Sequence, residues 1–173
     1  MIRKNPKITV ALLFLAVLHL AILFAGFVAP QDPSTQNREF SFVPPSHLRF
    51  VDAHGHLHLR PFIYQWGARP DGLHGYAESR EREYPVRFFV RGPQYKIAGL
   101  FESHTHLFGV DAPALIFLAG TDNYGRDQFS RILYGGQVSL AAGVLAAGTS
   151  LLLGSLVGCI SGFYGKWIDE SAM

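Results

Sequence analysis

The sequence predicts an α-helical membrane protein, with two transmembrane helices in this fragment and a small β-rich extracytoplasmic insertion between them. Three observations predict this class. Apolar runs long enough to cross a hydrocarbon core of ~30 Å stand near both ends of the 173-residue chain. The stretch between them is polar and rich in aromatic residues, as in a folded aqueous region. Cations without any acid precede the first run, which orients it in the membrane.

The first transmembrane helix is expected over residues 8–29, after a short cytoplasmic N-terminus of residues 1–7. Three cations stand in that N-terminus: Arg3, Lys4 and Lys7. Loops that remain in the cytoplasm carry such an excess of Lys and Arg, so the chain should enter the membrane heading outward. Pro30 and Pro33 should end the helix, because proline has no amide hydrogen to donate and its ring clashes with the preceding turn.

A cleaved signal peptide is the alternative interpretation of this run. Its apolar core would span about 7–15 residues and end at a small-x-small site. The run here is longer, and cleavage after Ala29 would place Phe27 at −3 and Pro30 at +1, both unfavourable. We therefore expect an uncleaved anchor. His19 within it could be a functional intramembrane group, but a neutral histidine packed against a neighbouring helix is the favoured interpretation.

Residues 30–119 are expected to form the extracytoplasmic region, because a second span returns the chain to the cytoplasm. Four short runs have strand character, at residues 47–51, 56–64, 86–90 and 95–100. Turns are predicted at residues 70–72 and 92–93, where proline and glycine stand together. The highly charged residues 78–84 are predicted to be a solvated helical turn or loop.

Histidines alternate in this region, which raises the question of a metal site. His54, His56 and His58 follow Asp52 and would share one face of a strand. His104 and His106 repeat the pattern. A zinc or copper site needs three or four ligands that converge in space, and alternation alone is a weak signal. We expect a partly exposed strand face and no metal or cofactor.

Several function classes find little support in the sequence. The net charge of +2 is small and scattered, so no nucleic-acid partner is expected. Neither a Ser/His/Asp elbow nor a GxGxxG loop or P-loop is present, so an extracytoplasmic enzyme has almost no support. The lone cysteine, Cys159, falls in the second apolar run and is interpreted as a small apolar residue.

Residues 120–137 are expected to form an amphipathic helix at the membrane interface. Thr121 or Asp122 could cap it, and Gly125 allows a tight bend. Its apolar stripe would consist of Phe129, Ile132 and Leu133. The opposite side would carry Arg126, Asp127 and Arg131. We interpret Arg126 and Asp127 as structural residues that form an ion pair at the interface.

The second transmembrane helix is expected over residues 138–163, before a cytoplasmic end of residues 164–173. Small residues recur at every fourth position of this helix: Ala142, Ala146, Ser150, Gly154, Gly158 and Gly162. Each step of four turns the face by only about 40°, so the series forms one slowly winding ridge. Such a ridge lets another helix approach closely, and it predicts packing against a partner helix.

The most specific stretch reads Gly-Thr-Asp-Asn-Tyr-Gly-Arg-Asp-Gln-Phe-Ser-Arg-Ile-Leu-Tyr-Gly, over residues 120–135. With the Ser-Gly-Phe-Tyr-Gly-Lys-Trp-Ile-Asp-Glu run of residues 161–170, it resembles the dipeptide/oligopeptide permease family of ABC transporters, C-type subunit. The residues that carry the motif are Gly120, Thr121, Asp122, Gly125, Arg126, Asp127, Ser130, Arg131, Tyr134 and Gly135. The anchor and the Ala-Pro-Gln-Asp-Pro that ends it are also similar. Residues 47–117 are longer than the external loop usual in that family.

The resemblance implies the N-terminal fragment of a permease subunit of an ABC-type importer, forming part of the transmembrane pathway for peptides. Such a subunit is multi-pass, lies in the cell inner membrane with its N-terminus in the cytoplasm, and is not an enzyme. Its partners would be a second homologous permease, two cytoplasmic ATPases, an extracytoplasmic substrate-binding protein and membrane lipid. The alternative is a membrane-anchored extracytoplasmic binding or sensory module, with metal as one candidate ligand, motivated by the histidines. For Arg126 and Asp127, a direct role in transport is the alternative to the structural interpretation.

Overall fold

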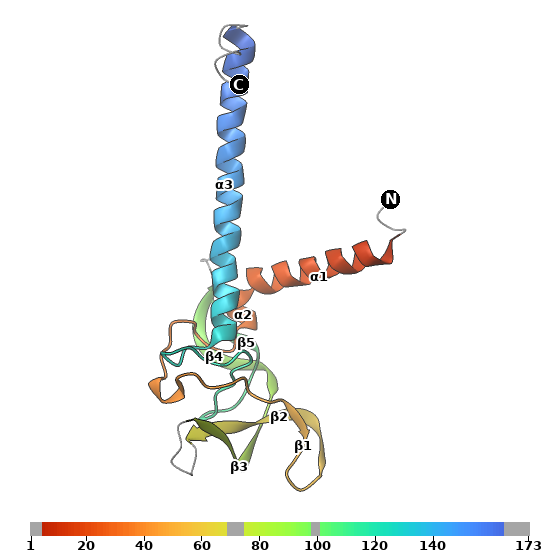
Figure 1. Cartoon of the computed structure of the whole chain (residues 1–173), viewed down its shortest axis with the longest axis vertical. Helices are drawn as coiled ribbons and strands as arrows, with labels where there is room; N and C mark the ends of the chain where they lie inside the picture. Colours follow the sequence, from red (N-terminus) through yellow and green to blue (C-terminus); the bar gives the residue numbers. More distant parts are fainter. Residues whose placement is uncertain (1–4, 69–74, 98–100, 165–173) are drawn as a thin grey trace. The chain divides into compact units, whose positions relative to one another are not determined.

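The computed structural model describes residues 5–68, 75–97 and 101–164. Figure 1 follows the chain from the red N-terminal helix to the blue C-terminal helix. The chain divides into two compact units, Met1–Gly135 and Gly136–Met173, and each is described by itself. Within these described residues, two helices are long and apolar enough to cross a membrane, over Pro6–Leu23 and Gln128–Phe163. The predicted membrane class fits these helices.

Helix α1 (Pro6–Leu23) is apolar on every side and has no buried residue. Its 18 residues measure about 27 Å at a rise of 1.5 Å each, close to the thickness of a hydrocarbon core. Pro6 occupies the start of the helix, where its missing amide hydrogen costs nothing. His19 places Nδ1 2.7 Å from the Leu15 carbonyl oxygen, so its polar ring is satisfied within its own helix.

The predicted single helix over residues 8–29 is divided in two. Phe24 departs from helical geometry (φ −98°, ψ 33°) between α1 and the short helix α2 (Ala25–Val28). The chain then becomes extended at Ala29 (ψ 127°). Ala29 precedes Pro30, whose ring disfavours the helical region for the residue before it. Proline therefore ends the helix one residue earlier than expected.

The β-rich insertion predicted from the sequence is present, as two antiparallel sheets. The first sheet holds β1 (Arg49–Val51), β2 (Leu57–Ala68) and β3 (Tyr76–Pro85), in that order. The second sheet pairs β4 (Arg87–Ile97) with β5 (Phe101–Gly109). Figure 1 shows the first sheet in yellow and the second in green.

Two local expectations within the insertion were wrong, and one strand was missed. Residues 78–84 are strand rather than solvated turn, because they pair with β2 through contacts such as Tyr64 opposite Glu83. Residues 92–93 lie in an irregularity inside β4 rather than at a turn, since the pairing with β5 shifts register between Arg91 and Tyr95. Residues 101–109 form a strand that the sequence did not indicate. The turn predicted at 70–72 lies outside the described residues.

The insertion leaves and rejoins the rest of the unit at one point, where Ser46 meets Phe117. The Ser46 amide donates to the Phe117 carbonyl oxygen at 2.7 Å, and the Phe117 amide donates to Ser46 Oγ at 3.1 Å. Beside this neck, Val43 and Phe117 pack against Trp66 of β2 in one buried cluster. Hydrogen bonds between Ser46 and Phe117, together with the apolar cluster beside them, thus hold the insertion to the residues before and after it.

Helix α2 is fixed to the second sheet by two close contacts. His106 of β5, which is buried, places Nδ1 2.6 Å from the Ala29 carbonyl oxygen and Nε2 2.9 Å from that of Pro93. Gly26 lies directly against the Tyr95 ring, where an added Cβ would come within 2.2 Å of Cδ2. A side chain larger than hydrogen therefore cannot fit at Gly26 unless a buried ring moves.

Helix α3 (Gln128–Tyr164) is one continuous helix of 37 residues, about 55 Å long. It is longer than a hydrocarbon core, and its first residues, through Gly135, belong to the first unit. The expected separate helix over 120–137 is therefore wrong in two respects. Residues 120–127 are not helical, and the helix that follows has no boundary near residue 138.

Replacing Gly26 with alanine is expected to destabilise the first unit by about 1–3 kcal/mol, because the Tyr95 ring is buried and cannot yield cheaply. The measurement is thermal unfolding of the full chain in detergent. Gly143→Ala is the matched control, because an added Cβ there meets nothing within 4 Å. A Gly26→Ala variant as stable as the Gly143→Ala variant would contradict the close contact.

Candidate functional site

The motif of residues 120–127 folds as a closed loop that ends where α3 begins. Thr121 and Asp127 form an antiparallel bridge, and the Gly125 amide donates to the Asp122 carbonyl oxygen at 3.0 Å. Gly120 and Gly125 have φ values of +73° and +71°, which favour glycine. A Cβ on Gly125 would also lie 1.8 Å from the Asn37 carbonyl oxygen, so this position excludes any side chain.

The Asp122 carboxylate is the centre of the loop. Its Oδ1 accepts the backbone amides of Tyr124 at 2.9 Å and Arg126 at 3.0 Å. Its Oδ2 accepts two nitrogens of the Arg126 guanidinium, each at 2.7 Å, and one from Arg131. The Arg126 guanidinium also lies over the Tyr124 ring, 4.8 Å from its centroid. One buried carboxylate thus joins the loop to the first turn of α3.

These contacts change the titration of Asp122. Burial works to raise its pKa, but hydrogen bonds from the Arg126 guanidinium and amide and from the Tyr124 amide outweigh burial and hold the pKa at about 2. The carboxylate is therefore ionised wherever the protein is near neutral pH, and it keeps both arginines paired. The expected ion pair between Arg126 and Asp127 was wrong, because Arg126 bonds to Asp122.

Asp127 caps α3 in place of the Thr121 or Asp122 cap expected from the sequence. Its Oδ2 accepts the Ser130 amide at 2.9 Å and the Ser130 hydroxyl at 2.5 Å. This is the N-cap arrangement, in which a side-chain oxygen satisfies a free amide of the first turn. A carboxylate there also suits the positive end of the helix dipole.

The Asp127 carboxylate is almost fully buried, with 1% of its surface exposed. Burial raises its pKa above the usual range, although the Ser130 hydroxyl and the amides of Ser130 and Phe129 oppose the shift. Its second oxygen, Oδ1, has no hydrogen-bond partner among the residues that the structure describes. Asp127 and Asp122, five residues apart, therefore have opposite titration behaviour because one is desolvated and the other is paired with guanidinium groups.

A segment between α2 and the insertion holds the loop from outside. The Thr121 hydroxyl donates to the Phe40 carbonyl oxygen and accepts the Val43 amide at 2.8 Å. The Thr121 amide donates to the Val43 carbonyl oxygen at 3.0 Å, and the Phe42 amide donates to the Asp122 carbonyl oxygen at 3.0 Å. The sequence motif gave no sign of this partner segment, whose residues form no motif themselves.

The remaining motif residues have different surroundings. Tyr134 and Phe129 pack against a buried cluster of Ala25, Ala29 and Leu133, which joins α2 to the first turns of α3. Ile132, expected in the same apolar stripe, is 65% exposed. Gly135 has open space around it.

The small-residue ridge of α3 lies in the second unit. Ala142, Ala146 and Ser150 are exposed. Open space surrounds Gly154, Gly158 and Gly162, with nothing within 4 Å of an added Cβ. Packing of a partner helix against this ridge stays a prediction.

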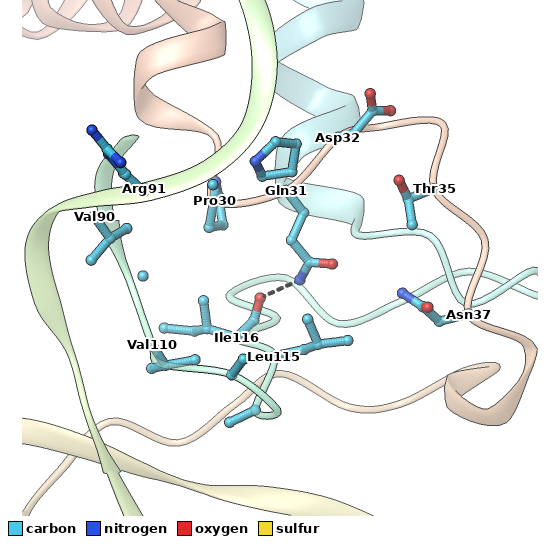
Figure 2. A pocket seen from close by; sticks show the side chains of 15 residues that line it. Pro30, Gln31, Asp32, Thr35, Asn37, Val90, Arg91, Val110, Leu115 and Ile116 are labelled. Carbon is cyan, nitrogen blue, oxygen red and sulfur yellow. Dashed lines mark hydrogen bonds between the residues drawn. The ribbon is translucent and has the colours of Figure 1, made fainter. Parts of the chain in front are cut away.

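A cavity of about 320 Å³ lies between the segment after α2 and the second sheet (Figure 2). The Gln31 side chain reaches across it and donates to the Ile116 carbonyl oxygen at 2.8 Å. Asp32 and Arg91 bring charge to the lining, but Asp32 Oδ1 already accepts the Ser34 amide at 2.7 Å. The buried Gln31 side chain therefore makes a structural contact across the cavity, joining the segment after α2 to Ile116.

The geometry of the motif is that of a rigid support. Asp122 pairs with both Arg126 and Arg131, and Asp127 and Ser130 begin the helix. The loop can therefore fix the position and direction of the first turns of α3 against α2 and the neighbouring segment. Its charged groups are engaged with one another rather than gathered around an open pocket.

Comparison with known proteins finds relatives among transport proteins. Residues 1–45 match the family described as the N-terminal TM domain of oligopeptide transport permease C. Over 50 residues, the chain is 50% identical to the dipeptide transport system permease protein DppC of Alkalihalophilus pseudofirmus, covering 29% of this chain and 16% of the relative. Over 63 residues, it is 38% identical to the glutathione transport system permease protein GsiD of Pectobacterium atrosepticum, covering 36% and 21%.

A third relative aligns with nearly the whole chain. The dipeptide transport system permease protein DppC of Haemophilus influenzae is 25% identical over 167 residues, which cover 96% of this chain and 36% of the relative. The matched parts of the first two relatives amount to about a fifth of their length. No solved structure matches the chain with statistical significance. The resemblance to peptide-transport permeases, inferred from the motif and the anchor, is confirmed.

Replacing Asp127 with alanine is expected to destabilise the first unit by about 1 kcal/mol and at most ~2, through loss of the cap. Asp127→Asn is the matched variant, because its amide oxygen can still accept the Ser130 amide and it carries no charge to bury. We expect Asp127→Asn to be at least as stable as the unaltered protein in thermal unfolding. Equal losses in the two variants would show that the charge, rather than the cap, is what matters.

Proposed function

We propose that this chain forms the N-terminal part of a permease subunit of an ABC-type importer and contributes to the transmembrane pathway for peptides. The observation that carries the proposal is the match of residues 1–45 to an oligopeptide permease domain. That matched segment includes Asn37 and Val43, which contact the motif loop directly. The motif and the matched domain are thus parts of one folded unit.

The proposed role of the motif loop is mechanical. A pathway helix that moves during transport must start from a fixed point, and α3 begins at a capped turn tied to the loop by Arg131 and Asp122. Buried Leu133 adds apolar contact with α2 within the same unit. Removal of the Asp122 carboxylate would leave two guanidinium groups without their shared partner.

The proposed partners follow from the relatives, each of which is named as a permease protein of a transport system. We infer a second homologous permease, two cytoplasmic ATPases and an extracytoplasmic substrate-binding protein. The ridge of α3 is the proposed contact with a neighbouring helix, because its glycines are free of contacts. The proposed setting is the cell inner membrane, with the N-terminus in the cytoplasm and the β-rich insertion outside.

The orientation can be tested by cysteine labelling in intact cells after Cys159 is replaced with alanine. Leu59→Cys should react with a membrane-impermeant maleimide, because Leu59 is 97% exposed and lies in the insertion. Lys7→Cys, at the start of α1, should react only after the membrane is permeabilised. The reverse pattern would place the insertion in the cytoplasm and overturn the proposed orientation.

The ridge can be tested by expressing the chain together with the partner permease and ATPases proposed above. Gly158→Leu should lower assembly of the permease with its partners and uptake of a labelled dipeptide, since the bulky side chain blocks close approach and costs on the order of 1–3 kcal/mol. Gly148→Leu is the matched control, because this glycine lies on the opposite face of α3 from Ala146 and Ser150. Normal assembly and uptake in the Gly158→Leu variant would count against the ridge.

A further inference from the structure

The first sheet brings Glu83 of β3 beside two side chains that are six residues apart, Asp52 and His58. Asp52 lies in the turn after β1, His58 in β2 and Glu83 in β3. Each offers one ligand atom, and the three atoms all lie within 4.8 Å of one another. We propose that Asp52, His58 and Glu83 bind a divalent transition-metal ion, with Zn²⁺ as the ion that the geometry fits best.

The distances match those of ligand atoms around a small ion. His58 Nε2 lies 3.3 Å from Asp52 Oδ2 and 3.6 Å from Glu83 Oε2. Ligands about 2.1 Å from a tetrahedral zinc ion stand ~3.4 Å from one another. An ion can therefore enter the cluster with only small side-chain adjustments.

Fixed neighbours hold the ligands in place. Asp52 Oδ1 accepts the amides of His54 and His56, each at 2.8 Å, so the carboxylate is oriented by its own turn. His56 Nδ1 lies 2.9 Å from Asp52 Oδ2, the arrangement of a supporting residue behind a metal ligand. The His58 ring packs edge-on against buried Phe62, 5.1 Å between centroids, which restricts its rotation.

The ligand chemistry indicates the class of ion. Two carboxylates this close repel each other, and a cation between them removes the repulsion. An imidazole nitrogen suits Zn²⁺, Ni²⁺ or Cu²⁺ better than Mg²⁺ or Ca²⁺, which prefer oxygen throughout. The His58 and Glu83 side chains are 38% and 32% exposed, so a bound ion would keep a position open to water or another ligand.

This site differs from the one that the alternating histidines suggested. His54 and His56 lie in the turn rather than on a strand, and His106 is buried against the Ala29 carbonyl oxygen. Only His58 of the alternating set ligates in the proposed site, and Glu83 comes from the charged stretch expected to be a loop. The proposal is independent of the transport function.

The test is a calorimetric titration with Zn²⁺. The protein is the full chain, purified in detergent without a histidine tag. Co²⁺ replaces Zn²⁺ in a second titration, where visible absorption reports the coordination. We expect one ion per chain at micromolar concentration. Binding should weaken by more than ~100-fold in His58→Ala and Glu83→Gln, and by about 10-fold in the supporting variant His56→Ala.

The matched control is His104→Ala, because His104 is an exposed histidine in the second sheet. It should bind Zn²⁺ like the unaltered chain. Fluorescence of buried Trp66, in the same strand as His58, checks that each variant is folded, with Trp167→Phe in every chain so that Trp66 alone emits. The proposal is overturned if the unaltered chain binds no metal at 100-fold above the expected range, roughly 0.1 mM. It is equally overturned if the loss appears in His104→Ala or is absent from Glu83→Gln.

Discussion

The ion pairing around the Asp122 carboxylate is the constraint on which the first unit depends. A buried charge is costly unless it is paired and hydrogen-bonded, and Asp122 receives two amides and two guanidinium groups. Three of those donors come from its own loop, but Arg131 belongs to α3. Satisfying this carboxylate therefore closes the loop and positions the helix in one step. The glycines at 120 and 125 are required because the loop lies flat against the backbone of Asn37 and Val43.

The parts of the fold that could be predicted from the sequence are those set by local composition. A run of apolar residues without charge predicts a membrane helix wherever it stands, and both α1 and the body of α3 follow that rule. Proline predicts the end of the first helix, although its effect reaches back to Ala29. The glycines of the motif predict backbone that other residues avoid, and Gly120 and Gly125 have positive φ.

The parts that could not be predicted depend on partners distant in the sequence. Charged residues of β3 favour solvent when taken alone, yet Glu78 is bonded by Arg49 and His47, and β2 supplies backbone partners along the strand. Thr121 and Asp122 were the caps expected from the sequence, and the tertiary structure shows that Asp127 caps the helix instead. No sequence spacing could predict the proposed metal ligands, because Glu83 is remote from His58 in the sequence and meets it only across the sheet.

The neck at Ser46 and Phe117 has a consequence for how such a chain can vary over evolution. Because the segments that enter and leave the insertion are hydrogen-bonded at Ser46 and Phe117, the ends of the insertion are closed at the neck itself. Lengthening a loop whose ends are fixed costs little entropy. Strands and turns far from the neck can therefore vary in length at little cost, whereas Tyr95 and His106, which pack against α2 and its end, must keep their places.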